Sequence, residues 1–136
     1  MYHTIIIVGN VGRDPEMRYT PSGQAVTNFS VATNRQYTAS DGSQVKETIW
    51  FRVSTWGKNA ETCNQYVRKG SKVLVEGRLN ADAKTGGPRI WQGQNGPAAS
   101  FEVTASTVRF LSSREEDSGA GPGEAIPGDA GEEIPF

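Results

Sequence analysis

The chain has 136 residues, enough for one domain and an additional segment. Its single cysteine, Cys63, excludes an internal disulfide, and its single histidine, His3, excludes a zinc site built from several His and Cys ligands. No apolar run approaches the ~18 residues that cross a bilayer, and Met1 is not followed by the basic and apolar regions of a signal peptide. We therefore do not expect a membrane protein, a secreted disulfide scaffold or a zinc finger.

The net charge of −1 conceals an uneven distribution of charge along the chain. Residues 1–111 hold 13 Lys and Arg against 8 Asp and Glu, a net charge of +5, whereas residues 112–136 hold one basic residue against seven acidic ones, a net charge of −6. Such asymmetry suggests a polyanionic partner for the basic part. Mild positive charge is also common in domains that bind no nucleic acid, so charge alone leaves both interpretations open.

Residues 1–111 are predicted to form strands. They contain three leucines against eleven valines and eleven threonines, and β-branched residues favour pleated surfaces over helices. Pro21 to Gly23 interrupts the first connection, and Asp41-Gly42 predicts a hairpin turn within a longer loop. We predict five strands, at residues 4–9, 26–34, 48–56, 72–80 and 100–111.

One helix is predicted between the third and fourth strands, over residues 58–69. Asn59 is a candidate N-cap, Arg68 and Lys69 would lie in the last turn, and Gly70 would end the helix. The apolar positions at helical spacing are Ala60, Cys63, Tyr66 and Val67. Five strands with a single helix at this place follow the order of an OB-fold, a partly open five-stranded Greek-key barrel in the all-β class.

The third predicted strand carries the main functional signal. Strand side chains alternate between faces, so an apolar face would line the barrel while the other face presents Trp50, Arg52, Ser54 and Trp56. Two exposed tryptophans around an arginine form a platform on which bases stack, with a guanidinium for phosphate. The alternative is that the tryptophans pack under loops or at a subunit interface. The small polar face of the second strand, with Asn28 and Ser30, gives weak further support for nucleic acid.

Two predicted loops add basic and aromatic residues that suit a grip on a single strand. Arg35 and Tyr37 open the second connection and Lys46 closes it, although Tyr37 could equally anchor its loop. Residues 81–99, between the last two strands, carry Lys84, Arg89 and Trp91 among glycines and prolines.

The sequence does not indicate catalysis, a metal or a cofactor. His3 has no second histidine and no paired carboxylate nearby in sequence, and Cys63 occupies an apolar helical position that predicts burial. Gly57-Lys58 lacks the rest of a P-loop, and the acidic residues are too scattered for a metal site.

Residues 112–136 differ in kind from the rest of the chain. Five glycines, three prolines and seven acidic residues offer little to bury, so we predict a disordered acidic tail and place the domain boundary after residue 111. The tail ends in Glu132, Glu133, Ile134, Pro135 and Phe136. Acidic residues followed by this apolar tip could dock in a basic-rimmed hydrophobic pocket on another protein.

Four segments together carry a family pattern. They are residues 7–16 with Arg18-Tyr19, then Trp50 to Val53 with Gly57-Lys58, then residues 66–70 with 75–79, and the terminal Glu-Ile-Pro-Phe. In this order they resemble the bacterial-type single-stranded DNA-binding proteins, over about residues 1–111 and the end of the chain. The segment from Lys84 to Trp91 does not follow the usual pattern of the family.

The resemblance implies an OB-fold that assembles as a homotetramer in the cytoplasm, associated with the nucleoid. It implies non-catalytic coating of single-stranded DNA in DNA replication, recombination and repair, with the tip at 132–136 recruiting partner proteins. The family's stacking aromatics match Trp50 and Trp56, and Tyr37 lies near the place of another. We list as candidate DNA-binding residues Trp50, Arg52, Ser54, Trp56, Lys58, Tyr37, Arg35, Lys46, Lys84, Arg89 and Trp91.

Two alternatives from other classes remain at this point. A stacking platform does not distinguish DNA from RNA, so an RNA-binding OB module is possible, although the acidic tip argues against it. A protein-interaction OB module, such as a primosome component, would place the same aromatics in an interface.

Overall fold

The structure is a computed structural model that describes residues 1–111. The predictions made for residues 112–136, including the domain boundary, the acidic tail and the partner-binding tip, lie outside the described residues. Within residues 1–111 the chain forms eight strands and one helix. In chain order these are β1 (Ile5–Val11), β2 (Glu16–Tyr19), β3 (Ala25–Thr38), β4 (Gln44–Trp56), α1 (Lys58–Tyr66), β5 (Lys72–Leu79), β6 (Ile90–Gly93), β7 (Gly96–Ala99) and β8 (Phe101–Phe110).

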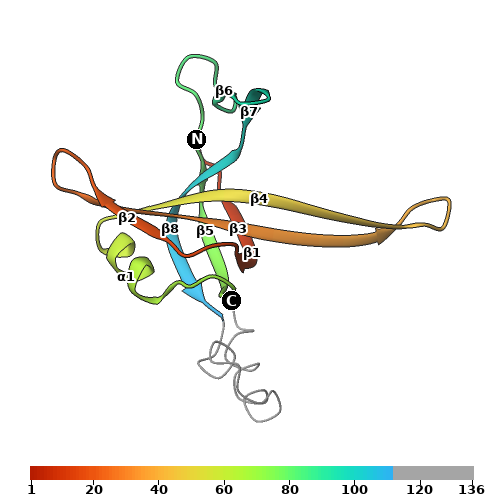
Figure 1. The fold of residues 1–136 in the computed structure, drawn as a ribbon, viewed down its shortest axis with the longest axis horizontal. Coiled ribbons are helices and arrows are strands. Elements are labelled where there is room, and N and C mark those ends of the chain that lie inside the picture. Colours follow the sequence, from red (N-terminus) through yellow and green to blue (C-terminus); the bar gives the residue numbers. More distant parts are fainter. Residues whose placement is uncertain (112–136) are drawn as a thin grey trace, which may run out of the picture.

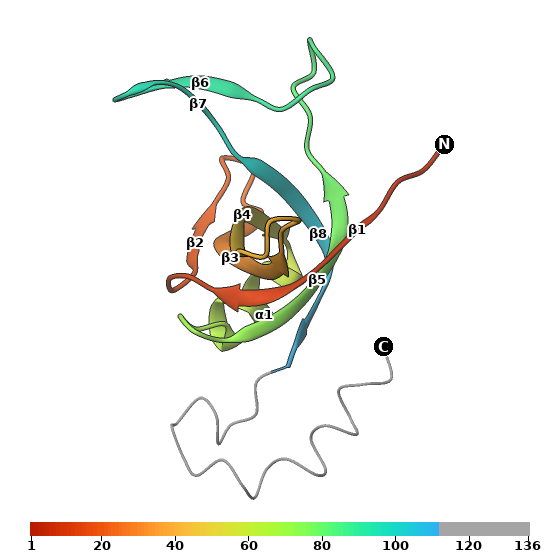
Figure 2. The ribbon, with the colours of Figure 1, turned by 90° about the vertical axis from the view of Figure 1, so that its right-hand side faces the viewer.

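Five of the strands close into a barrel (Figures 1 and 2). The sheet has the order β1-β5-β8-β4-β3-β2, and β1 also pairs with β3, which joins the two sides of the sheet. β4 and β8 run parallel, whereas the other pairs of this sheet are antiparallel. The five barrel strands β1, β3, β4, β5 and β8 correspond to the five predicted from the sequence, and the predicted OB-fold is confirmed.

The core follows from alternation along these strands. Val31, Val53, Val75 and Val103 are fully buried, one from each of β3, β4, β5 and β8. Their branched side chains fill the interior with little rotamer entropy to lose. Gly9 permits closure of the barrel, because a Cβ at this position would fall on the carbonyl oxygen of Ala32 where β1 meets β3.

The helix α1 packs against the barrel through Ala60 and Cys63, both of which are buried as predicted. Thr27 of β3 donates its hydroxyl to the carbonyl of Ala60 at 2.6 Å. Burial raises the pKa of the Cys63 thiol, and a hydrogen bond involving Thr55 opposes that effect only in part. The predicted cap at Asn59 is wrong: the N-cap is Gly57, and Asn59 instead donates its amide to the carbonyl of Ser106 at 3.1 Å.

The helix also ends earlier than predicted, at Tyr66 rather than at residue 69. Val67 adopts an extended conformation and is completely buried, so the chain leaves the helix to place this side chain in the core. Arg68 and Lys69 therefore follow the helix instead of forming its last turn. Tyr66, predicted on the apolar face, is 58% exposed.

Three parts of the chain predicted as connections contain strands. β3 and β4 extend beyond the predicted 26–34 and 48–56 as a two-stranded arm, paired out to Thr38 and Gln44, that projects from the barrel (Figure 1). Residues 81–99 contain the hairpin β6–β7, which pairs only with itself and stands away from the barrel (Figure 2). β2, also missed, extends the sheet beside β3. Within the part that the structure describes, no helix is long and apolar enough to span a membrane.

Candidate nucleic-acid interface

β4 presents the predicted alternation. Val53 and Thr55 point into the barrel and are completely buried, whereas Trp50 and Trp56 on the opposite face are 53% and 41% exposed. Arg52 lies between them on the same outward face and is also exposed. The structure thus confirms the orientation of these side chains, and a role for them in binding remains a prediction.

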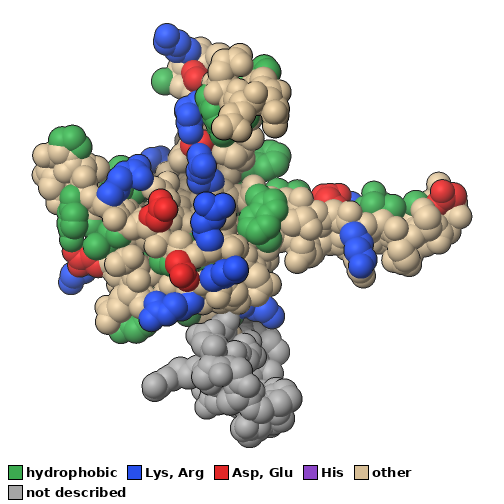
Figure 3. All heavy atoms as spheres, in the orientation of Figure 1, with side chains coloured by type: hydrophobic (Ala, Val, Ile, Leu, Met, Phe, Trp, Pro, Cys, Tyr) green, Lys and Arg blue, Asp and Glu red, His purple; other side chains and the backbone are tan. Residues whose placement is uncertain are grey.

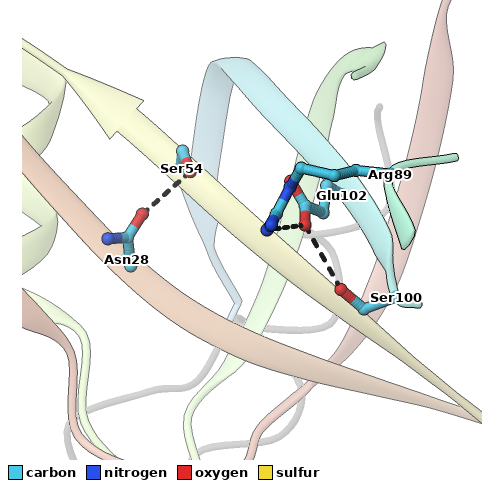
Figure 4. Close-up of polar contacts among 5 residues, drawn as sticks. All are labelled: Asn28, Ser54, Arg89, Ser100 and Glu102. Atoms are coloured by element: carbon cyan, nitrogen blue, oxygen red, sulfur yellow. Dashed lines mark hydrogen bonds and ion pairs between the residues drawn. The ribbon is translucent and has the colours of Figure 1, made fainter. Parts of the chain in front are cut away.

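The neighbouring strands continue this outward face with small polar side chains. Asn28 of β3 lies opposite Ser54, whose hydroxyl donates to the Asn28 side-chain oxygen at 2.8 Å (Figure 4). Ser30 lies opposite Arg52 on one side, and Glu102 of β8 is the partner of Arg52 on the other. Short side chains here keep the surface low, and a polar hollow of about 380 Å³ lies over β3, β4 and the start of β8.

Arginines surround this hollow, which we call the basic groove. Figure 3 shows Lys and Arg side chains gathered along the middle of this face of the barrel, with acidic side chains beside them. The groove is lined by Arg13, Asp14, Glu16, Arg18, Asn28, Phe29, Ser30, Arg52, Ser54, Arg89 and Glu102. Of the predicted site residues, it brings together Arg52, Ser54 and Arg89.

Trp50 is positioned by a glycine in the turn after β1. A Cβ on Gly12 would fall on ring atoms of Trp50, with Cη2 at 2.7 Å, so the ring lies close against the backbone there. The amide of Gly12 donates to the carbonyl of Ser30 at 2.9 Å, which fixes this turn to β3 beside the groove. The ring is therefore held on one side and open to solvent on the other.

Two guanidinium groups lie near the ring of Trp91. The Cζ of Arg89 is 4.9 Å from the centre of this ring and that of Arg52 is 5.9 Å away, distances at which cations interact with the ring face. Arg89 also forms an ion pair with Glu102, with 2.7 Å between Nη2 and Oε2. Arg89 and Trp91 thus lie beside the barrel face, where they contact Glu102 and Arg52, and a role for them in binding remains a prediction.

Arg35, Tyr37 and Lys46 lie on the projecting arm rather than in loops, because β3 and β4 remain paired there. The guanidinium of Arg35 covers the Tyr37 ring at 4.5 Å and lies 3.6 Å from Glu47. These residues do not line the basic groove; they extend the basic and aromatic surface away from it.

The arm ends in the predicted Asp41-Gly42 turn. Asp41 accepts hydrogen bonds from the amide of Ser43 at 3.0 Å and from its hydroxyl at 2.7 Å. These bonds favour the carboxylate and lower the pKa of Asp41.

Two predicted site residues lie apart from the groove. Lys58 is the first residue of α1 and is exposed just after Trp56. Lys84 lies in the loop before β6, where its amide donates to the Asp82 side chain at 2.8 Å. Neither lines the hollow.

Several groove residues were not among the predicted site residues. Arg18 lies in β2, a strand that was not predicted, and Arg13 precedes that strand, although neither was singled out within the segments that carry the family pattern. Glu102 was overlooked because a carboxylate is unexpected in a site for a polyanion. No local pattern marked it, because its place opposite Arg52 depends on the pairing of β4 with β8.

Among residues 1–111, no group of three or more His, Cys, Asp and Glu side chains is arranged to hold a metal ion. His3 accepts a hydrogen bond from the amide of Leu79 at 3.0 Å, at the edge of the barrel away from the groove. The groove presents guanidinium groups, carboxylates and small polar side chains, and the exposed indole rings of Trp50 and Trp56 lie on the same outward face of β4.

Comparison with known sequences gives consistent relatives. The sequence is 42% identical over 125 residues to the single-stranded DNA-binding protein of Wolinella succinogenes, covering 91% of this chain and 73% of that protein. It is 42% identical to that of Helicobacter hepaticus, covering 84% of this chain and 64% of the relative. The chain thus spans roughly two thirds to three quarters of the length of these relatives.

Solved structures share the fold. A Plasmodium falciparum SSB in complex with ssDNA superposes with a TM-score of 0.68 at 26% identity, over 82% of this chain and 96% of that one. A deletion variant of the single-stranded DNA binding protein from Thermus aquaticus gives a TM-score of 0.65 at 27% identity, over 82% of this chain and 51% of that one. The sequence model of the single-strand binding protein family matches residues 2–111. The chain therefore belongs to the single-strand binding protein family.

Proposed function

We propose that this chain binds single-stranded DNA with little sequence preference, without catalysis, and that the basic groove and its bordering aromatics are the binding site. The observation that carries the proposal is the outward face of β4, where exposed Trp50 and Trp56 flank Arg52 beside a hollow lined by further arginines. Relatives that are named single-stranded DNA-binding proteins support it.

In this proposal, base stacking and phosphate contacts both contribute to binding. Bases stack on Trp50 and Trp56, each stack contributing roughly 1–3 kcal/mol whatever the base. Phosphates contact the guanidinium groups of the groove, with Arg35 and Lys46 of the arm, Lys58, and Lys84 near the hairpin as outlying cations. Tyr37 and Trp91 provide additional rings. Duplex DNA is excluded because its bases are already stacked and paired.

The proposal extends to assembly and partners. By resemblance to the family, the chain forms a homotetramer, acts in replication, recombination and repair in the cytoplasm at the nucleoid, and recruits proteins through residues 132–136. We also propose that residues 1–111 form the binding domain and residues 112–136 an acidic tail. The net charges of +5 and −6 on these two parts agree with that division.

Intrinsic tryptophan fluorescence tests the central claim. Titration of the full chain with a long oligo-dT is expected to quench the emission strongly, because bases stack on the indole rings. An equal length of duplex should quench little. Raising the salt should weaken binding, with a log–log slope of roughly −0.7 for each phosphate neutralised. No quenching by oligo-dT at low salt would contradict the proposal.

A matched oligoribonucleotide separates DNA from RNA. We expect the deoxy-oligomer to compete more strongly, and preference for the ribo-oligomer would favour an RNA-binding module instead.

Trp50→Ala and Trp56→Ala are each expected to weaken oligo-dT binding by about tenfold, the equivalent of one lost stack. If neither variant changes affinity, the rings do not stack on bases.

A further inference from the structure

Three acidic side chains, Asp14, Glu16 and Glu102, line the basic groove, and Glu102 forms an ion pair with a groove arginine. Glu102 lies on β8 directly beside Arg52 on β4, and its side chain is only 18% exposed. Its carboxylate accepts a hydrogen bond from Nη2 of Arg89 at 2.7 Å and one from the hydroxyl of Ser100 at 3.5 Å (Figure 4). A carboxylate at this place repels the phosphates of any strand that enters the groove.

The same ion pair ties the β6–β7 hairpin to the barrel. β6 and β7 pair with each other and with no barrel strand. Arg89 stands immediately before β6, and Trp91 is its second residue. Two side-chain contacts join this hairpin region to the barrel face: Arg89 with Glu102, and Trp91 with Arg52.

A carboxylate and a phosphate diester are alternative partners for one guanidinium. Both are anionic oxygen acceptors, and both form short, charge-assisted hydrogen bonds with arginine. The Arg89 side chain is about half exposed, so an incoming phosphate can reach it without unfolding any part of the barrel.

We propose that Glu102 is an internal competitor for Arg89. In the free protein its carboxylate occupies the guanidinium, and in the complex a backbone phosphate of the bound strand takes its place. The exchange also frees the β6–β7 hairpin from Glu102, so that Arg89 and Trp91 move with the strand. Glu102 thereby lowers the affinity of the groove. This inference rests on the proposed binding of single-stranded DNA.

Glu102→Gln tests the competition, because the amide keeps the size and acceptor oxygen of the side chain and removes its charge. Affinity for oligo-dT at low salt is expected to rise by about two- to fivefold, the range that a surface ion pair contributes. If Glu102 instead serves to position Arg89 for the strand, the variant will bind more weakly. Weaker or unchanged binding would overturn the proposal.

Glu16→Gln is the matched control. Glu16 lines the same hollow, and it forms no ion pair with any other residue in the described part of the chain. The variant therefore removes one negative charge from the groove without releasing an arginine, and a smaller gain is expected. Equal gains in the two variants would mean that general repulsion, rather than competition for Arg89, explains the effect.

Arg89→Ala supplies a second route to the same answer. In the Arg89→Ala variant there is no guanidinium at residue 89 for Glu102 to hold. Adding Glu102→Gln to this variant is therefore expected to raise oligo-dT affinity no more than adding Glu16→Gln does. A larger gain in affinity would contradict the competition.

NMR spectra of the ligand-free protein give a readout without DNA. The indole N–H resonance of Trp91 should shift in Glu102→Gln and stay in place in Glu16→Gln. If that resonance does not move in Glu102→Gln, Glu102 does not hold the hairpin.

The outcomes separate the two proposals. If the unmodified chain binds oligo-dT but Glu102→Gln does not raise the affinity more than Glu16→Gln does, only the role of Glu102 is overturned. If the unmodified chain binds no oligo-dT at all, the proposed function fails and this inference fails with it.

Discussion

Gly12 shows how one residue without a side chain organises the groove. It lies in the turn after β1, and the Trp50 ring covers the space where its Cβ would be. Its backbone torsion is outside the left-handed region, so alanine fits the backbone there. The obstacle to a side chain is therefore the Trp50 ring alone. Because that ring is at the surface, it can move without disturbing the core.

We expect Gly12→Ala to weaken oligo-dT binding by about tenfold, since a displaced Trp50 loses roughly one base stack. Its stability should change little, within ~0.5 kcal/mol, as is usual for surface substitutions. Fluorescence titration and a denaturant melt measure the two effects.

The control for Gly12→Ala is the same substitution in a Trp50→Ala background. With the ring absent, the new methyl group meets nothing from residue 50, and no further loss of affinity is expected. An additional loss in that background would mean that Gly12 acts through its own backbone and not through Trp50.

Single residues differ in how well their sequence pattern predicted their place. The alternation along 49–56 predicted both the buried and the exposed faces of β4, because a strand with one buried side leaves its register little freedom. Glu102 and Arg13 could not be predicted as neighbours of Arg52 from such a pattern. Their approach depends on the pairing of β4 with β8 and on the turn after β1, contacts between distant parts of the sequence.

At the scale of elements, sequence patterns did not predict the strands and the helix end that depend on tertiary contacts. β2 has only four residues and none of them is buried, so no apolar alternation marks it. The strands of the hairpin β6–β7 also have four residues each and no buried residue, so no apolar alternation marks them either. The helix ended early because burial of Val67 outweighed the helix propensity of the residues after it. The five barrel strands were predicted because each carries buried valine or isoleucine.

The projecting arm depends on its turn, and the turn depends on a carboxylate. Asp41 holds the amide and hydroxyl of Ser43, and these bonds lower its pKa below the usual 3.8. A lowered pKa in the folded state means that the stabilising contribution is present above the ordinary value and is lost as the pH falls through the lowered one. The turn should therefore loosen only in strong acid.

We expect the amide resonance of Ser43 to titrate with a midpoint below 3.8, as Asp41 gains its proton and the hydrogen bonds weaken. NMR spectra recorded through the acid range measure this midpoint. In Asp41→Asn the side-chain oxygen remains an acceptor but cannot titrate, so the same resonance should lose that transition. A midpoint at or above the ordinary value would show that the turn does not favour the carboxylate.

At the scale of the whole molecule, the barrel combines a closely packed interior with an exterior that presents groups suited to binding. Its interior is closed by β-branched residues and by the approach of β1 to β3 at Gly9, which makes a rigid support. Its exterior presents exposed tryptophans, and arginines gathered over one face. A rigid barrel keeps these groups spaced before a ligand arrives, so binding costs less ordering than a flexible site would require.

The uneven charge of the chain adds a long-range term to binding. Residues 1–111 carry a net charge of +5 and residues 112–136 a net charge of −6, so the acidic segment is expected to compete with DNA for the basic groove. A chain that ends at residue 111 should bind oligo-dT several-fold more tightly at low salt. Fluorescence titrations of the two chains, repeated at increasing salt, measure the difference.

Salt and a charge-neutral variant decide whether that effect is electrostatic. The Debye length falls from about 30 Å at 0.01 M to about 8 Å at 0.15 M, so the advantage of the shortened chain should shrink as salt is added. Replacing the seven acidic residues of 112–136 by their amides should reproduce the gain at full length. Equal affinities of the full and shortened chains at low salt would show that residues 112–136 do not compete for the groove.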